Sequence, residues 1–479
     1  MAHTVTLLLA AFTIATVGRA QSLVLTTGLP EYYFGAGDLD GDGVADVGYY
    51  AQPLQQTLMF RSGLNGAPLP WLSRPGMGLG WAGQFAPVGD ANGDGYDDFA
   101  YFVQGLQPNF VEVVSGADGA SLWTWSVTNP LVYGMPGLAV DVDGDGCDEI
   151  TFTHEVAGVR VAEVRSGRTG GVLLTVSNAW IVPVGDTNGD GYGDVAVMTG
   201  ASTYTALLRL GPSLAPGATF GDRCWPVGDT NGNGTSDLFG EYVVASSAIF
   251  DGNGGVLWWT GMAALRATGC GDVDGDGCDD VLLVDPPPLG GPDWLQSGAT
   301  DVQLPGPQPD GVIHPLGDVD GDGRCELGDR DAQFQPALLQ WVDAAQPLVS
   351  RMVRRGAGGT TSQGHRPRVH TRGSCRIGHT AWFDLRGGQP AGFTFLLFGD
   401  PVDVDMAPFG APGSRAYVDH IWEALLATDG HGVAVHSLAV PNSVALLGGT
   451  LSVQAAVVDP AANALGLVGA NAVDLTVAN

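Results

Sequence analysis

Residues 38–46 read DLDGDGVAD, and six further copies of this acidic stretch follow along the chain. They read DANGDGYDD, DVDGDGCDE, DTNGDGYGD, DTNGNGTSD, DVDGDGCDD and DVDGDGRCE. The seven copies begin at Asp38, Asp90, Asp141, Asp186, Asp229, Asp272 and Asp318, so successive copies start 43 to 52 residues apart. A fixed period in this range is typical of repeat architectures, including propeller blades.

Each copy has oxygen-bearing side chains at its first, third, fifth and ninth positions and glycine at its fourth and sixth. Short acidic side chains at alternate positions of a tight turn can converge on one calcium ion, and glycine lets the backbone curl. We therefore expect up to seven structural calcium ions. The expected ligands are Asp38, Asp40, Asp42, Asp46, Asp90, Asn92, Asp94, Asp98, Asp141, Asp143, Asp145, Glu149, Asp186, Asn188, Asp190, Asp194, Asp229, Asn231, Asn233, Asp237, Asp272, Asp274, Asp276, Asp280, Asp318, Asp320, Asp322 and Glu326.

Two other interpretations of these acidic loops can be weighed. An EF-hand needs glutamate at position twelve and flanking helices, whereas Tyr49 and Phe152 stand there and strand-like residues follow. An acidic turn that binds nothing is plausible for one copy, but seven copies in register argue against it. The loop that begins at Asp229 has only two carboxylates, so we expect it to bind calcium most weakly.

Short apolar runs rich in β-branched and aromatic residues surround the loops, for example Phe99–Val103 and Val281–Val284. Pro-Val-Gly precedes several loops, and glycine-containing turns such as Ser115–Gly119 divide the rest of each repeat. About four short strands a repeat is the content of a propeller blade. We therefore predict an all-β fold, a seven-bladed β-propeller over residues 21–345. The run Leu23–Thr26 is expected to complete the last blade, with Gln346–Val353 as the competing candidate.

The C-terminal part of the chain has a different composition. Seven of the twenty basic residues, all arginines, lie between Arg351 and Arg376, which suggests a solvated Arg/Gly-rich linker over residues 346–374. A functional alternative is that this basic segment docks on an acidic polysaccharide or on the acidic face of the propeller itself. Residues 375–479 alternate strand-like runs with glycine and proline, which predicts a small β-sandwich domain.

The composition favours an extracellular protein. The net charge is −31, which opposes binding to nucleic acid and to anionic membranes. Residues 1–20 resemble a signal peptide, with an apolar core from Val5 to Val17 and small residues before Gln21. No other stretch has the length and apolarity of a transmembrane segment. We expect secretion or display at the cell surface.

The six cysteines form no CxxC pair, which disfavours a zinc ribbon or a redox motif. An oxidising compartment permits disulfides, and Cys270, Cys278 and Cys325 lie in or beside neighbouring loops. A local bridge among these three is therefore plausible, although the sequence leaves the pairing open.

The loops, with Phe34-Gly35-Ala36-Gly37 before the first, resemble FG-GAP/VCBS-type repeats of the integrin α-chain propeller and of secreted bacterial proteins. The resemblance covers residues 22–345 and implies a calcium loop between the first two strands of each blade. Residues 453–477 resemble the end of a C-terminal β-domain on repeat-rich secreted bacterial proteins. In that domain an early cysteine has a partner after Pro-Gly; here Ser414 follows Pro412-Gly413, so the bridge of Cys375 is expected to be missing.

No catalytic motif is present: the nine histidines are scattered and form no HExxH, and His154-Glu155 is expected to be an ordinary strand-end pair. Trp123, Trp125, Trp258 and Trp259 could stack on sugar rings, although packing within blades is the more usual role. The sequence favours a calcium-binding module for adhesion or recognition of an extracellular glycan or protein, rather than an enzyme. An extracellular polysaccharide lyase or hydrolase on the same scaffold is the alternative.

Overall fold

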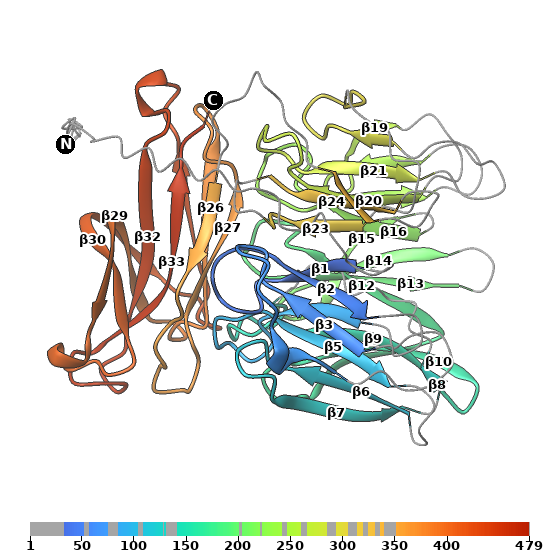
Figure 1. Cartoon of the computed structure of the whole chain (residues 1–479), viewed down its shortest axis with the longest axis horizontal. Helices are drawn as coiled ribbons and strands as arrows, with labels where there is room; N and C mark the ends of the chain where they lie inside the picture. Colours follow the sequence, from blue (N-terminus) through green and yellow to red (C-terminus); the bar gives the residue numbers. More distant parts are fainter. Residues whose placement is uncertain are drawn as a thin grey trace.

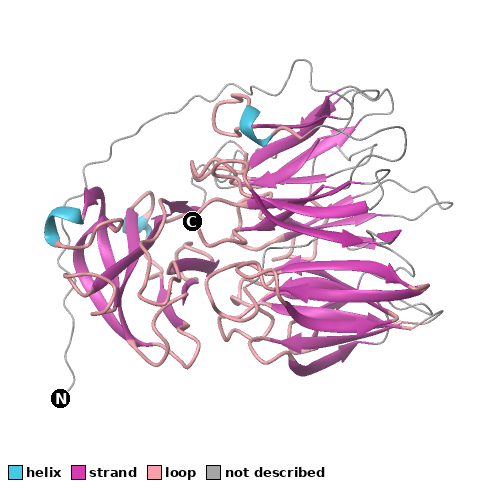
Figure 2. Ribbon diagram, turned by 90° about the horizontal axis from the view of Figure 1, so that it is seen from below, coloured by secondary structure: helices cyan, strands magenta, loops and turns pink. Residues whose placement is uncertain are grey.

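The computed structural model describes residues 33–51, 57–74, 85–103, 109–127, 129–130, 141–200, 204–220, 223–241, 247–259, 266–284, 294–304, 314–319, 324–330, 336–339 and 351–478. In these residues the chain is almost entirely β, as predicted, with three short 3₁₀ turns: η1 (Pro70–Leu72), η2 (Ala407–Phe409) and η3 (Val444–Leu446). Figure 2 shows strands throughout and only short helical turns. No helix among the described residues has the length and apolarity needed to cross a membrane.

Small antiparallel sheets of three or four strands make up the first two thirds of the described chain. In chain order they are β1 (Tyr33–Gly37), β2 (Asp46–Ala51) and β3 (Thr57–Arg61); β4 (Phe85–Gly89), β5 (Asp98–Val103), β6 (Asn109–Val114) and β7 (Ser121–Val127); β8 (Asn129–Pro130), β9 (Ile150–Val156), β10 (Val159–Arg165) and β11 (Val172–Ser177); β12 (Ala179–Gly185), β13 (Asp194–Thr199), β14 (Thr205–Leu210) and β15 (Ala215–Phe220); β16 (Arg223–Gly228), β17 (Asp237–Glu241), β18 (Ala248–Phe250) and β19 (Val256–Trp259); β20 (Arg266–Gly271), β21 (Asp280–Val284) and β22 (Trp294–Gln296); and β23 (His314–Gly317), β24 (Glu326–Arg330) and β25 (Pro336–Leu339).

The first strands of these sheets lie against one another in chain order. β12 contacts β16, β16 contacts β20, and β20 contacts β23. β1 contacts both β4 and β23, so the first small sheet lies beside the second and also beside the last of the small sheets. This is the propeller-like arrangement that the repeats predict. The count of seven blades stays a prediction, because the strand expected before Asp141 falls largely in residues 131–140, outside the described residues. The run Leu23–Thr26, proposed to complete the last blade, also lies outside them.

A β-bulge explains the Pro-Val-Gly signature before the loops. The pairing of β12 with β13 shifts between Pro183 and Gly185, and five other loop-preceding strands shift at the matching place. Gly185 has φ 78°, a left-handed conformation that glycine adopts without steric cost. The bulge ends the strand and turns the chain into the acidic loop.

Apolar cores fill the spaces between adjacent sheets. Between the first two sheets, the ring centroids of Phe60 and Phe99 lie 4.7 Å apart, and those of Phe34 and Phe85 lie 4.3 Å apart. Trp123, Trp125 and Trp258 pack partly buried against such cores, which confirms the packing role expected for them. The side chain of Trp259 lies outside the described part of the chain.

The C-terminal strands form two packed sheets, which lie beside the small sheets in Figure 1. The five-stranded sheet has the order β26 (Arg351–Arg355), β33 (Leu467–Thr476), β32 (Thr450–Val458), β29 (Phe393–Asp405) and β30 (Arg415–Ala427), and the three-stranded sheet has the order β27 (Arg368–Gly373), β28 (Thr380–Arg386) and β31 (Ala434–Ala439). One core joins them: Phe383 of β28 contacts Phe398 of β29 with 5.9 Å between ring centroids.

One expectation about this region is wrong. Within the described residues 351–374 the segment is not merely a linker, because β26 pairs with β33 and β27 pairs with β28. Met352 and Val369, which alternate with arginines in the sequence, pack on the C-terminal core. This packing explains why the segment forms strands. The run Gln346–Val353 therefore does not complete the last small sheet through its final residues, which belong to β26.

The local disulfide among Cys270, Cys278 and Cys325 is also wrong, because all six cysteines are free thiols. The geometry explains this. Cys278 lies against Gly232 in the preceding loop, and Cys325 lies against Gly271. The two sulfur atoms therefore face different neighbours. Cys375, whose bridge was expected to be missing, forms no disulfide and is buried.

Candidate metal centres

The structure places the acidic loops where the repeats predicted. Six of them join the first and second strands of a sheet: β1–β2, β4–β5, β12–β13, β16–β17, β20–β21 and β23–β24. The loop that begins at Asp141 leads into β9 in the same way. In the seventh loop, Asp320 and Asp322 lie outside the described residues, while Asp318 and Glu326 lie within them.

The loops share an internal hydrogen-bond pattern, clearly seen in the loop that begins at Asp141. The Gly146 N–H donates to Asp141 Oδ2 at 3.0 Å, the Asp145 N–H to Asp143 Oδ1 at 3.2 Å, and the Cys147 N–H to Asp145 Oδ1 at 2.9 Å. The loops that begin at Asp38, Asp90, Asp186, Asp229 and Asp272 repeat these bonds. The backbone N–H groups thus orient the carboxylates of the first, third and fifth positions.

In four loops the ninth-position acid ties the loop to the hairpin turn of the same sheet. Asp46 Oδ2 accepts from the Leu39 N–H at 2.8 Å, and Asp46 Oδ1 accepts from the Gly63 N–H at 3.1 Å. Asp98, Asp194 and Asp280 bond Gly116, Gly211 and Gly298 in the same way. The sequence identified these acids as metal ligands and the glycines as turns, without the bond between them.

The eighth position, which carries no acidic pattern, joins neighbouring loops. Its backbone N–H donates to the carbonyl oxygen of the first residue in the preceding loop, at 2.8 to 3.0 Å. The seven bonds run Asp97 to Asp38, Asp148 to Asp90, Gly193 to Asp141, Ser236 to Asp186, Asp279 to Asp229, Cys325 to Asp272 and Ala45 to Asp318. We call this set the loop ring. It links every acidic loop to the next and returns from the last to the first.

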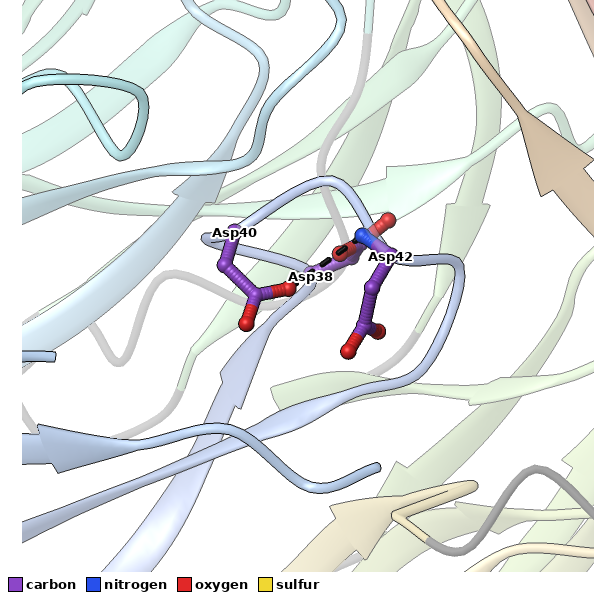
Figure 3. Close-up of side chains that lie close together, drawn as sticks. All are labelled: Asp38, Asp40 and Asp42. Atoms are coloured by element: carbon purple, nitrogen blue, oxygen red, sulfur yellow. Dashed lines mark hydrogen bonds between the residues drawn. The ribbon is translucent and has the colours of Figure 1, made fainter. Parts of the chain in front are cut away.

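Three loops bring three carboxylates together closely enough to share one cation. In each, one oxygen atom from each acid lies within 4.8 Å of the other two: Asp38, Asp40 and Asp42; Asp141, Asp143 and Glu149; and Asp272, Asp274 and Asp276. Figure 3 shows the first group, with the backbone N–H of Asp42 bonded to Asp40. An all-oxygen donor set suits a hard cation such as calcium.

Unsatisfied buried oxygens support the same fit. Asp38 Oδ1 and Glu149 Oε1 are buried and accept no hydrogen bond. A buried carboxylate oxygen without a partner is costly, and a cation between the carboxylates would remove that cost. The residues present therefore fit a divalent metal ion.

Burial and mutual repulsion raise the pKa values of these acids. Burial is the larger cause, and it raises the pKa of Asp46 and Asp272 to about 8 and that of Asp38 to about 7. The pKa of the fully buried Glu149 is raised well above its usual range by burial and by Asp143 and Asp141. Without a cation, these loops favour protonated carboxyls in the folded state.

In the loops that contain asparagine, side-chain amides reduce the repulsion between carboxylates. The amide Nδ2 of Asn92 donates to Asp94 Oδ2 at 2.9 Å, and that of Asn188 donates to Asp190 Oδ2 at 3.0 Å. In the weakest expected site, Asn233 Oδ1 accepts from the Thr235 hydroxyl at 2.6 Å. These amides replace a repulsive carboxylate pair with a hydrogen bond, which is consistent with weaker demand for a cation.

Arginines of the C-terminal sheets lie directly on the acidic loops. Arg354 Nη2 is 3.3 Å from Asp97 and 3.6 Å from Asp38. Arg372 Nε lies 3.6 Å from Asp186 and 2.6 Å from Asp384. These ion pairs dock the basic segment on the acidic loops. This is the alternative to a solvated linker that the sequence left open. Figure 2 shows the loops gathered between the two groups of sheets.

Arg368 is the most enclosed of these arginines. Its Nη1 lies 3.3 Å from Asp90 Oδ2 and 3.3 Å from Asp148 Oδ2, and the three side chains are at most 5% exposed. Nearby, Arg366 Nη1 donates to the carbonyl oxygen of Asp94 at 3.2 Å. Sequence reasoning missed this contact, because the partners lie more than 200 residues apart. The cluster of arginines after Arg351 was the only signal for it.

Within the described part of the chain, no histidine belongs to a group of three side chains placed to share a metal ion. His154 Nε2 lies 3.7 Å from Glu163 Oε1, on the neighbouring strand.

Comparison with solved structures gives distant similarity. Rhamnogalacturonan lyase YesW is 14% identical, with 74% of this chain and 70% of that chain covered and a TM-score of 0.38. BamB from Moraxella catarrhalis is 12% identical over 62% and 82% of the two chains, with a TM-score of 0.36. BBS1N in complex with ARL6DN is 9% identical over 67% and 94%, with a TM-score of 0.42. These are β-propeller proteins; at such identities the likeness carries nothing about activity. No family model matches the chain.

Proposed function

We propose that this chain is an extracellular calcium-binding repeat protein that recognises a glycan or protein ligand, and that its calcium ions are structural. One observation carries the metal assignment: three loops each bring three acids within 4.8 Å, and Asp38 and Glu149 have a buried oxygen without a partner. The side chains at positions one, three, five and nine of each loop would hold the ion. A bound calcium ion supplies positive charge and 6–8 oxygen-directed coordination positions.

A structural role for the ions follows from where the loops lie. In four loops the ninth-position acid bonds a hairpin glycine, and the eighth-position N–H groups form the loop ring. Arginines such as Arg354 and Arg368 cover the loops from the C-terminal side. An ion in this position would stabilise the ring and its contact with the C-terminal sheets rather than meet a ligand from solvent.

Recognition at the surface is supported by the acidic composition, by the signal-like first 20 residues and by the resemblance to FG-GAP/VCBS-type repeats. Because the loop side faces the C-terminal sheets, the ligand surface would lie at the other ends of the strands.

The test is a screen of the full mature chain against immobilised polysaccharides and extracellular-matrix proteins, with calcium and with EDTA. We expect saturable binding to at least one ligand in calcium, without conversion of it. Chain shortening of a polysaccharide would favour the lyase or hydrolase alternative. Absence of binding to every glycan and protein in calcium would contradict the recognition role.

A further inference from the structure

A polar pocket lies between the third and fourth small sheets, at the strand ends away from the acidic loops. It has a volume of about 650 Å³, within the range of small-ligand sites. Glu155, Arg160, Ser177, Asn178, Thr199 and Tyr204 line it. Thr199 ends β13, the strand that starts with the loop acid Asp194, so the pocket is roughly 17 Å from the loop at about 3.3 Å a residue.

A fixed positive charge stands in this pocket. The Arg160 guanidinium lies over the indole of Trp180, 4.0 Å from the ring centroid. Arg223 lies in the same way over Tyr204, at 4.7 Å. Guanidinium keeps its charge at any physiological pH, and stacking on a ring holds its plane in one orientation. The pocket is therefore prepared for a planar anion such as a carboxylate.

Arg160 also retains a donor that the protein does not use. Its Nε is buried, and no acceptor for it lies among the described residues. Arginine binds carboxylates in a fork through parallel N–H groups. Because the Nε–H is enclosed by protein atoms, a carboxylate in the pocket would meet the terminal N–H groups of the guanidinium.

Tyr204 adds a second polar contact on the same side. Its pKa is lowered, first by a hydrogen bond with Trp180 and then by a hydrogen bond with Arg160 and the charge of Arg223. The phenol oxygen therefore lies in a positive environment, in a chain whose net charge is −31. Arg160 and Arg223 outnumber the one carboxylate of the lining, Glu155, and this favours a ligand that carries negative charge at one point.

The pocket has a rigid rim. One residue, Asn178, connects β11 to β12, and it adopts φ 56°. Its N–H donates to the carbonyl oxygen of Arg160 at 2.7 Å. Ala157, at the tip of the β9–β10 hairpin, also has a positive φ of 52°. Such conformations persist where the surrounding structure determines them, and they occur often at binding sites. The backbone of Arg160 is thus fixed by the connection between sheets.

The remaining lining groups suit hydroxyl groups. Ser177 and Thr199 can donate and accept hydrogen bonds, the Asn178 amide can do both, and the Glu155 carboxylate accepts. A ligand with one carboxylate and several hydroxyls matches this set. We propose that this pocket binds an acidic sugar residue of the uronate type, with Arg160 on the sugar carboxylate. The proposal rests on the recognition role proposed above and names its ligand class and place.

The experiment measures binding of the full mature chain, in calcium, to a panel of uronate oligosaccharides and to the same oligosaccharides with their carboxyl groups reduced. Arg160→Gln and Tyr204→Phe test the pocket, and Arg160→Lys keeps the charge but removes the fork. Arg415→Gln, which changes the same charge on the C-terminal sheet, is the matched control. Thermal unfolding of each variant checks that it is folded.

We expect the wild type to prefer a uronate oligosaccharide over its reduced form by about tenfold or more, the effect of losing a charge-assisted hydrogen bond. Arg160→Gln should weaken this binding by about tenfold or more, Arg160→Lys less, and Arg415→Gln not at all. Equal binding of the reduced sugars, binding unchanged in folded Arg160→Gln and Tyr204→Phe, or no binding to the panel would overturn the proposal. If a protein or another glycan still binds in the broader screen, the recognition role stands while this pocket assignment fails.

Discussion

The backbone N–H of Ala45 donates a 3.0 Å hydrogen bond to the carbonyl oxygen of Asp318, so the first acidic loop of the chain is bonded to the last. The two residues are separated by nearly the whole set of repeats, and six equivalent bonds connect the loops between them. The acidic loops therefore form a continuous structure around the ring of sheets. The backbone hydrogen bonds that fix one acidic loop therefore also fix the loops on either side of it.

The buried arginine of the loop side should be essential to stability. Arg368→Gln removes the guanidinium that pairs with Asp90 and Asp148, and both acids are at most 1% exposed. Loss of one partner of a buried ion pair costs about 3–5 kcal/mol, so we expect that decrease in the free energy of unfolding, measured by denaturant titration in calcium.

Arg415→Gln is the control for that change. Its ion pair with Asp403 is about half exposed, and such pairs contribute roughly 0–1 kcal/mol. Equal effects of the two substitutions would mean that the arginines of β27 do not support the loops.

The hairpin glycines should tolerate no side chain. A Cβ on Gly116 would lie 2.1 Å from the carbonyl oxygen of Asp97 and 2.7 Å from that of Leu39, both backbone atoms. Overpacking of this kind costs about 1–3 kcal/mol or more. We expect Gly116→Ala to lower the free energy of unfolding by at least about 2 kcal/mol. Gly430→Ala, where a Cβ would meet nothing within 4 Å, should stay within about 0.5 kcal/mol of wild type.

Chelated protein should become less stable as the pH rises. The folded-state pKa values of Asp46, Asp141 and Asp272 are raised to about 8 and those of Asp194 and Asp237 to about 7, against about 3.9 unfolded. The folded state holds more protons, so stability is lost as pH rises from about 4 towards 8. We expect the Tm in EDTA to fall across this range.

The stabilisation by calcium should increase as the pH rises, because calcium competes with protons for the carboxylates. The gain in Tm from calcium should grow from pH 5 to pH 8. The titration is repeated in about 0.5 M NaCl, which screens long-range repulsion. A pH dependence of the Tm that persists in this salt arises from the closely packed carboxylates of the loops rather than from the net charge of the chain. A Tm in EDTA that rises with pH would be inconsistent with buried, repelling carboxylates.

The loops should differ in affinity according to their acids. Asp274→Asn removes one of three converging carboxylates in its loop, so it should remove one tight calcium site from an isothermal titration. Asn231→Ala changes a loop with only two carboxylates, so the number of tight sites should not change. Loss of a tight site in Asn231→Ala alone would reverse the proposed order.

The sequence predicted the repeated parts of this molecule well and the long-range contacts poorly. The short strands and the positions of the acidic loops between them could be anticipated, because each depends on residues close in the chain. The loop ring could not, because its donors at Ala45, Gly193 and Cys325 act through the backbone N–H, which any residue but proline supplies. The pairing of Arg368 with Asp90 depends on how two groups of sheets pack, so composition alone suggested a linker.

The most direct test of the central claim is thermal unfolding of the chelated chain with and without added calcium at pH 7.5, with magnesium as the control cation. We predict that several calcium ions bind tightly to each chain and raise the Tm well above its value in EDTA. Magnesium should raise the Tm less, because it dehydrates reluctantly. A Tm that is the same in EDTA and in calcium, with no ions bound, would contradict it.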